Sequence, residues 1–292
     1  MFVYRTYSVS RFLWLLLADA FVFSICMVFF FVGKCFLSSA DSQNEEPVRL
    51  PVIMYHSIYG DNRSQYVVTP EQVENDLCWL RNNGYESVTA QEVIEYTKGR
   101  GTLPLKPVMI TLDDGYYNNL KYMLPLLEKY DMTAVISVVG TYTDNDAACD
   151  PNIPSYSYLT WNDIMLLVGS GRVELGNHTY SMHSLNAERT GCRKRSDETE
   201  DEYRKAFNED ISKLQDEFKK NIGINPVVFT YPFGAVSRES LPVIRENGFL
   251  MTLTCREKQN YITRDPDCLY GIGRFNRSGL TSTEEYMRKI TE

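Results

Sequence analysis

The stretch VMITLDDG, residues 108–115, joins a strand-like segment to two carboxylates and a glycine. An uninterrupted run such as VMITL is typical of a strand that is buried on both faces, as strands of parallel sheets are. The Asp-Asp-Gly that follows is typical of a turn at the end of such a strand. Residues 108–115 therefore predict a central parallel strand with two acidic side chains at its carboxyl end.

Segments of the same kind recur along the chain and alternate with helical patterns. Strands are expected at residues 51–55, 108–112, 133–138, 173–175, 227–231 and 249–254. Helices are expected after Thr69, after Thr89, at residues 119–129, after Thr160, and at residues 200–220 and 237–247. Thr69 and Thr89 each begin a sequence typical of a capping box. This alternation predicts an α/β fold with a parallel sheet.

The number of strand–helix units favours a barrel over an open doubly wound sheet. Six or seven units lie between residue 50 and about residue 273, and no G-x-G-x-x-G follows any expected strand. The polar stretches at residues 143–155 and 186–201 are expected to be loop insertions.

Composition excludes several classes of protein. Of the 292 residues, 43% are hydrophobic and 23% are charged, which is the ordinary composition of a globular protein and excludes a chain that is disordered throughout. The net charge of −8 argues against a nucleic-acid partner, which would require a basic surface. The aromatic content of 13% suits stacking on sugar rings and a large core equally well.

Seven cysteines occur, and none forms a C-x-x-C pair, so a cysteine zinc site is not expected. Cys78 and Cys255 lie among apolar residues and are expected to be buried thiols. Cys149 and Cys192 lie in polar stretches and could pair.

The amino terminus carries a long apolar segment at residues 12–32, FLWLLLADAFVFSICMVFFFV. As a helix it spans about 30 Å, the thickness of a bilayer core, and Asp19 is its single charge. Arg5 and Arg11 precede it and place the amino terminus in the cytoplasm by the positive-inside rule. We expect one transmembrane helix within residues 1–37, a linker at 38–49, and a catalytic domain at 50–292 outside the membrane. The alternative is a signal peptide cleaved after residues 38–40 (SSA), which would give a secreted protein.

The chain has three histidines, His56, His178 and His183, and each follows closely on an expected strand. Active sites of α/β barrels lie at this end of the strands. A five-residue step on a helix would turn the rings of His178 and His183 about 140° apart, so binding of one metal by both requires a loop. Two histidines and one aspartate can make a metal site with open positions, and the second aspartate is then free to act as a base.

Four segments together resemble the motifs of the polysaccharide deacetylases with a NodB-like domain, carbohydrate esterase family 4. They are residues 51–58 (PVIMYHSI), 111–115 (TLDDG), 176–179 (GNHT) with His183, and 231–234 (YPFG). The resemblance covers about residues 50 to 280, in both order and spacing. The M-Y-H-S opening and the four residues between the histidines are similar to the subgroup that acts on cell-surface and wall glycans.

The resemblance implies a distorted, incomplete (β/α) barrel of about seven strands. It also implies hydrolysis of N-acetyl groups on N-acetylglucosamine-type residues of a cell-wall or cell-surface polysaccharide, such as peptidoglycan or poly-N-acetylglucosamine. On this pattern Asp114, His178 and His183 bind a divalent metal, usually Zn²⁺, with Co²⁺, Ni²⁺ or Fe²⁺ as alternatives. The metal activates water, Asp113 accepts its proton as general base, and the backbone N–H of Phe233 helps to hold the oxyanion.

Two departures from the family pattern leave questions open. Many members have an arginine where this chain has Thr230, and many have a later histidine, whereas none follows His183 here. The general acid is therefore either His56 or Asp113 returning its own proton. Arg274 and Arg277 either supply the missing positive charge or lie in solvent. A glycan-binding pseudo-enzyme on the same fold and a metal-dependent amidase acting on a small molecule are the alternative functions.

Overall fold

The computed structural model describes residues 46–60, 63–146, 153–186 and 189–292, together with Ser24 and Met27. The chain divides into two compact units, Met1–Glu46 and Pro47–Glu292. Apart from Ser24 and Met27, the expected membrane segment at residues 12–32 lies outside the described residues. Within the described part of the chain, no helix combines the length and the apolar character needed to cross a membrane.

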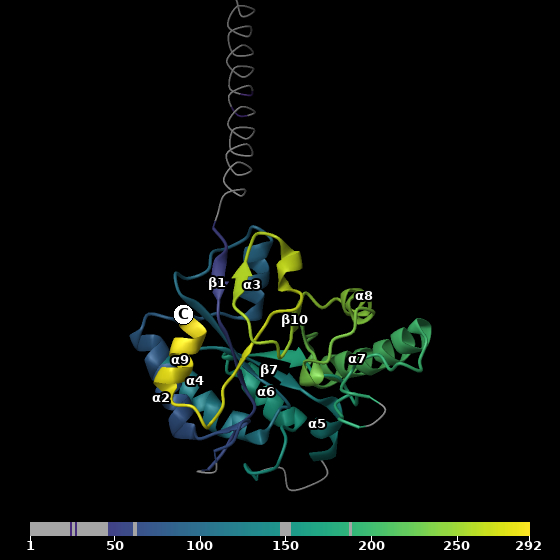
Figure 1. Ribbon diagram of the computed structural model, residues 1–292, viewed down its shortest axis with the longest axis horizontal. Helices are drawn as coiled ribbons and strands as arrows, with labels where there is room; N and C mark the ends of the chain where they lie inside the picture. Colours follow the sequence, from purple (N-terminus) through teal and green to yellow (C-terminus); the bar gives the residue numbers. More distant parts are fainter. Residues whose placement is uncertain (1–23, 25–26, 28–45, 61–62, 147–152, 187–188) are drawn as a thin grey trace, which may run out of the picture. The chain divides into compact units, whose positions relative to one another are not determined.

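Seven parallel strands form the main sheet of the second unit, a half-barrel at its centre (Figure 1). In spatial order they are β10 (Met251–Leu253), β9 (Val228–Thr230), β8 (Val173–Asn177), β7 (Ala134–Val138), β6 (Pro107–Leu112), β2 (Val52–Tyr55) and β12 (Phe275–Asn276). A short strand, β5 (Glu86–Ser87), also pairs with β6. Every residue of β6 is buried, as expected for residues 108–112. The predicted α/β class and the parallel sheet are confirmed.

Helices surround this sheet. They are α2 (Pro70–Asn82), α3 (Ala90–Thr97), α4 (Leu124–Tyr130), α5 (Gly140–Asp146), α6 (Trp161–Gly169), α7 (Glu200–Ile222), α8 (Ser240–Glu246) and α9 (Thr283–Thr291). One π-helical turn, Asn119–Met123, leads into α4, and two 3₁₀ turns lie at Pro232–Gly234 and Pro266–Leu269. Figure 1 shows α2, α4 and α9 grouped together, with α7 and α8 grouped elsewhere, and α2 contacts both α4 and α9.

The expected helix starts are confirmed in detail. Thr69, Thr89 and Thr160 each accept a hydrogen bond from the backbone of the residue three positions later, and that residue's side chain bonds back. These capping boxes satisfy amide groups that the first turn of a helix leaves without partners.

Two expected boundaries are wrong because long-range contacts decide them. Residues 143–146, expected in a loop, belong to α5, where Asp144 accepts hydrogen bonds from the Trp161 indole and the Tyr180 hydroxyl. Residues 48 and 49, expected in the linker, belong to β1 (Val48–Leu50), which pairs antiparallel with β11 (Asn260–Ile262). A further short pair, β3 (Ser57–Ile58) with β4 (Val67–Val68), was not predicted.

The chain from Ile272 to Arg277 connects the two edges of the half-barrel. The Ile272 amide donates to the carbonyl of Thr252, in β10, at 2.9 Å. At the other end, the Arg277 amide donates to the Met54 carbonyl of β2 at 2.9 Å. Arg274 lies between these two attachments.

Candidate active site

Asp114, His178 and His183 meet at the carboxyl ends of the strands. Asp114 follows β6, His178 follows β8 directly, and His183 lies in the loop beyond it. Asp114 Oδ1 is 3.1 Å from His183 Nε2 and 3.6 Å from His178 Nε2. One ligand atom from each of the three residues lies within 4.8 Å of the others. The expected arrangement, with the histidine pair on a loop, is confirmed.

Hydrogen bonds to the far side of each ring turn both Nε2 atoms toward Asp114. His178 Nδ1 is 2.7 Å from the Thr230 carbonyl oxygen, which can only accept, so Nδ1 carries the proton. His183 Nδ1 is 3.1 Å from the Tyr142 hydroxyl, which also donates to the His183 carbonyl at 3.3 Å. Each ring can therefore offer the lone pair of Nε2 to a metal.

The charge states also fit a metal site. Burial lowers the pKa of His178 to about 4, although the neighbouring Asp113 acts in the opposite direction. Burial alone would raise the pKa of Asp114, but its hydrogen bond to His183 and the nearby imidazoles lower it. A carboxylate with imidazole nitrogens is the ligand set expected of a divalent metal such as zinc.

Asp113 is held by Arg274. Arg274 Nη1 is 2.7 Å from Asp113 Oδ1, and Nη2 is 2.7 Å from Oδ2. The exposed fraction is 0% for the Arg274 side chain and 2% for that of Asp113. Burial by itself raises the pKa of Asp113, but the charge and hydrogen bonds of Arg274 outweigh it and hold that pKa well below its usual range. Asp113 is therefore ionised.

Many members of the family in question have an arginine where this chain has Thr230, and Arg274 takes over the role of that arginine here. The Thr230 hydroxyl shares a 2.7 Å hydrogen bond with the Ser137 hydroxyl. Arg274 supplies the positive charge, and its Nε donates to the Thr254 carbonyl at 3.0 Å. Arg277 pairs with Asp76 rather than with the site. Both arginines are buried, so the alternative that they lie in solvent is wrong.

Every predicted site residue lines one cavity of about 750 Å³. It is lined by Met54, His56, Gln65, Tyr66, Asp113, Asp114, Tyr116, His178, His183, Leu185, Phe233, Cys255, Glu257 and Asn276. His56 Nδ1 is buried and has no hydrogen-bond partner among the described residues. The Phe233 ring packs against that of His183, with the ring centroids 4.5 Å apart.

Several motif residues hold backbone conformations that side chains rarely adopt. Asp114, Thr179 and Phe233 have φ values of 70°, 71° and 57°. Left-handed conformations of this kind cluster at functional sites, where the surrounding structure enforces them. Close packing acts in the same region, because a Cβ on Gly176 would lie 2.3 Å from the Ser137 hydroxyl oxygen.

Other lining residues were not predicted, or were predicted differently. Tyr66 lies edge-on to His56 at 5.0 Å between ring centroids, and 52% of it is exposed. Cys255 is half-buried and lines the cavity, so the expectation of a buried core thiol is wrong there; Cys78 is also only half-buried. Cys192 is a buried free thiol, and its suggested partner Cys149 lies outside the described residues.

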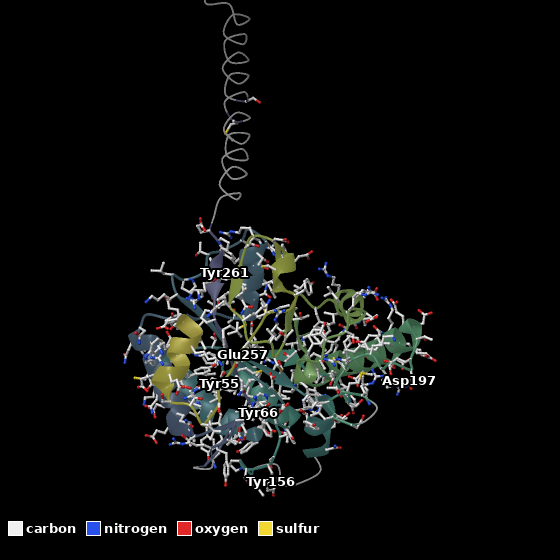
Figure 2. All side chains as sticks on the ribbon, viewed as in Figure 1. Tyr55, Tyr66, Tyr156, Asp197, Glu257 and Tyr261 are labelled. Atoms are coloured by element: carbon white, nitrogen blue, oxygen red, sulfur yellow. The ribbon has the colours of Figure 1, made fainter. Side chains whose placement is uncertain are left out.

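A second, smaller hollow of about 320 Å³ continues the cavity toward α9. The two share Gln65, Glu257 and Asn276 as lining residues. Figure 2 labels Tyr66 and Glu257, which both line the cavity, and Tyr261, which does not. Together the two form a combined hollow that extends from the metal ligands to Ser278, Leu280 and Lys289.

Comparison with known proteins agrees with this geometry. The family model for polysaccharide deacetylase matches residues 100–252, which run from β6 into β10 and include Asp113, Asp114, His178 and His183. The chain belongs to the polysaccharide deacetylase family. The predicted resemblance to this family is thereby confirmed. Three of the four motif segments lie within the matched residues, whereas residues 51–58 lie outside them.

Individual members of the polysaccharide deacetylase family resemble the chain over most of its length. A poly-beta-1,6-N-acetyl-D-glucosamine N-deacetylase from Escherichia coli (strain K12) is 27% identical over 69% of this chain and 33% of its own length. An enzyme of the same name from Staphylococcus aureus (strain MRSA252) is 23% identical over 76% and 73%. The chain thus spans about a third of the length of the Escherichia coli relative.

A solved structure shares the fold. The de-N-acetylase from Aggregatibacter actinomycetemcomitans has a TM-score of 0.71 and 24% identity, covering 83% of this chain and all of its own. At this identity the likeness shows the fold of this polysaccharide deacetylase and nothing more about its chemistry.

Proposed function

We propose that this chain is a metal-dependent hydrolase that removes N-acetyl groups from N-acetylglucosamine-type residues of a polysaccharide. The observation that carries the proposal is the Asp114–His178–His183 cluster beside Asp113, whose two oxygens are held by Arg274, in one cavity. A pseudo-enzyme has no need of an ionised base fixed next to a complete ligand set.

The substrate class follows from the relatives and from the shape of the site. Relatives named for poly-beta-1,6-N-acetyl-D-glucosamine favour that polymer over peptidoglycan. The combined hollow and the exposed Tyr66 ring suit a chain of sugars rather than a small molecule, because aromatic faces stack on sugar rings. A small-molecule amidase would leave the hollow beside Glu257 without a role.

The metal, most often Zn²⁺ in such a donor set, would polarise the acetyl carbonyl and make water more acidic. Asp113, kept ionised by Arg274, accepts the proton from the attacking water. The backbone N–H of Phe233 stabilises negative charge on the carbonyl oxygen.

His56 is the better of the two candidates for the general acid. Arg274 stabilises the ionised form of Asp113, so Asp113 tends to pass its proton on rather than keep it. His56 lines the same cavity and can deliver a proton to the departing amine. If Asp113 returned the proton itself, His56→Ala would leave kcat near the wild-type value.

The direct experiment is a measurement of acetate release from poly-β-1,6-N-acetylglucosamine oligomers, chitin oligomers and peptidoglycan. We expect release from the first, its loss after treatment with a chelator, and its return on adding back Zn²⁺ or Co²⁺. Binding of the oligomers without acetate release under any metal would favour the pseudo-enzyme. Release from small amides alone would favour the amidase.

We further propose that residues 12–32 anchor the enzyme in the cell membrane with the catalytic domain outside the cytoplasm. The apolar run and the preceding Arg5 and Arg11 support this orientation. Cell fractionation with protease treatment of intact cells tests it. Full-length protein in the soluble cytoplasmic fraction would contradict the proposal, and a mature protein starting at Asp41 would show a cleaved signal peptide instead.

A further inference from the structure

A carboxylate outside the cavity, that of Asp76 on α2, is fully buried and accepts four hydrogen bonds. The Tyr55 hydroxyl donates to Oδ2 at 2.8 Å, and the Thr283 hydroxyl donates to Oδ1 at 2.7 Å. Arg277 supplies the other two, with Nε 2.6 Å from Oδ2 and Nη2 3.1 Å from Oδ1. The Arg277 guanidinium is buried as well, so charge is balanced inside the protein.

Tyr55, the first partner of Asp76, lies next to the active site in the chain. It is the last residue of β2 and precedes His56. Its carbonyl oxygen accepts the amide of Asp113 at 3.1 Å. Holding the Tyr55 side chain therefore holds the strand end from which both His56 and the Asp113 turn are placed.

Arg277, the second partner, lies next to Arg274. Only β12 separates the two arginines, and β12 has just two residues paired with β2. Side chains an odd number of positions apart leave an extended segment on opposite faces. Arg274 accordingly reaches Asp113, and Arg277 reaches Asp76.

The segment from Arg274 to Arg277, which contains β12, is thus held by one buried ion pair on each of its faces. Pairing through only two residues fixes the register of a strand weakly. An arginine–carboxylate pair on each face of β12 restricts how far the strand can shift along β2. A small shift of β12 would take Arg274 off one of the two oxygens of Asp113.

We propose that Asp76 is a positioning residue, which through Arg277 and Tyr55 fixes β12 against β2 and so keeps Arg274 on both oxygens of Asp113. The kinetic part of the test rests on the proposed deacetylase function. The alternative is that the network only attaches α9, because Thr283 is the first residue of that helix. A purely structural role would lower stability without changing the chemistry of the folded protein.

The test variant is Asp76→Asn, which keeps the size of the side chain and removes its charge. Its matched control is Ile290→Ala, which truncates a fully buried residue of α9 and leaves Asp76 and Arg277 in place. Both are assayed as full-length protein, below the melting temperature of each. We expect kcat for acetate release to fall on the order of 10-fold to 100-fold in Asp76→Asn, with KM and bound metal unchanged. Ile290→Ala should keep kcat within about twofold.

A double-mutant cycle separates positioning from general damage. In Arg274→Lys the bidentate contact with both oxygens of Asp113 is already lost. Adding Asp76→Asn to this variant should therefore change kcat by less than about twofold. Losses that multiply in the double variant, or equal kcat losses in Asp76→Asn and Ile290→Ala, would overturn the proposal.

A second measurement needs no catalytic activity. The Nε–H of Arg274 is buried on the Thr254 carbonyl, so its exchange with water, followed by NMR, should be slow in the wild type. Exchange should become faster in Asp76→Asn and stay slow in Ile290→Ala. If Asp76→Asn does not fold, Arg277→Lys, which keeps the charge with a single donor, takes its place. Unchanged exchange at Arg274 overturns the proposal, whereas an inactive wild type with this exchange pattern would refute only the deacetylase function.

Discussion

The Arg274 guanidinium binds both oxygens of the Asp113 carboxylate through two hydrogen bonds of 2.7 Å, and both side chains are buried. The partners are 161 positions apart in the sequence, so this contact joins the carboxyl-terminal part of the chain to the active site. Its planar, two-point geometry orients the carboxylate as well as keeping it ionised.

This geometry predicts that Arg274→Lys is damaging although the positive charge is retained. A lysine ammonium cannot reproduce the two parallel bonds, so Asp113 loses its fixed orientation. We expect kcat to fall by about 10²-fold, with stoichiometric metal still bound. The control is Arg245→Lys, the same change at an exposed arginine paired with Asp267. Wild-type kcat in Arg274→Lys would show that the contact does not orient the base.

The Tyr142 hydroxyl is predicted to set the metal affinity. It holds Nδ1 of His183, and loss of such a partner typically weakens metal binding by about 10-fold to 100-fold. Tyr142→Phe should therefore bind zinc more weakly in a competition titration with a chromophoric chelator. Tyr156→Phe, at an exposed tyrosine, should bind zinc as the wild type does. Equal affinity in the two variants would count against a role for Tyr142.

Tyr66 is predicted to contribute to substrate binding rather than to chemistry. Its half-exposed ring lines the cavity and offers a face for a sugar. Tyr66→Ala should raise KM for an N-acetylglucosamine oligomer by about 10-fold, with kcat changed much less. Tyr261→Ala removes a similarly exposed ring that does not line the cavity, and its KM should stay at the wild-type value. A loss confined to kcat would instead point to disturbance of His56.

Local sequence patterns predicted the strands and the metal cluster well. The buried strand β6 and the turn at Asp113 and Asp114 are adjacent in sequence, so the local sequence pattern is enough to place the two carboxylates at the end of the strand. Parallel strands bring their carboxyl ends together, which is why His178 could be placed beside Asp114 without knowledge of the exact fold. The capping boxes at Thr69 and Thr89 likewise depend on four consecutive residues each.

The contacts that were missed are non-local. Nothing around Arg274 or Arg277 distinguishes a buried ion pair from a solvated charge, because their partners Asp113 and Asp76 come from distant segments. The same holds for Tyr142, whose role depends on α5, a helix in a stretch that was expected to be partly loop. Composition and periodicity describe single elements, whereas these side chains are defined by how the elements meet.

The central claim is that Asp113 is the general base of a metal-dependent deacetylase, and Asp113→Asn tests it most directly. The variant keeps the shape of the side chain and an oxygen for Arg274, but it cannot take up a proton in the same way. Melting temperature and elemental analysis are measured alongside acetate release, to establish that the protein is folded and that its metal is present. We predict a loss of about 10²–10⁴-fold in kcat with stoichiometric metal and unchanged oligomer binding. A folded, metal-loaded Asp113→Asn that releases acetate at the wild-type rate would contradict the account.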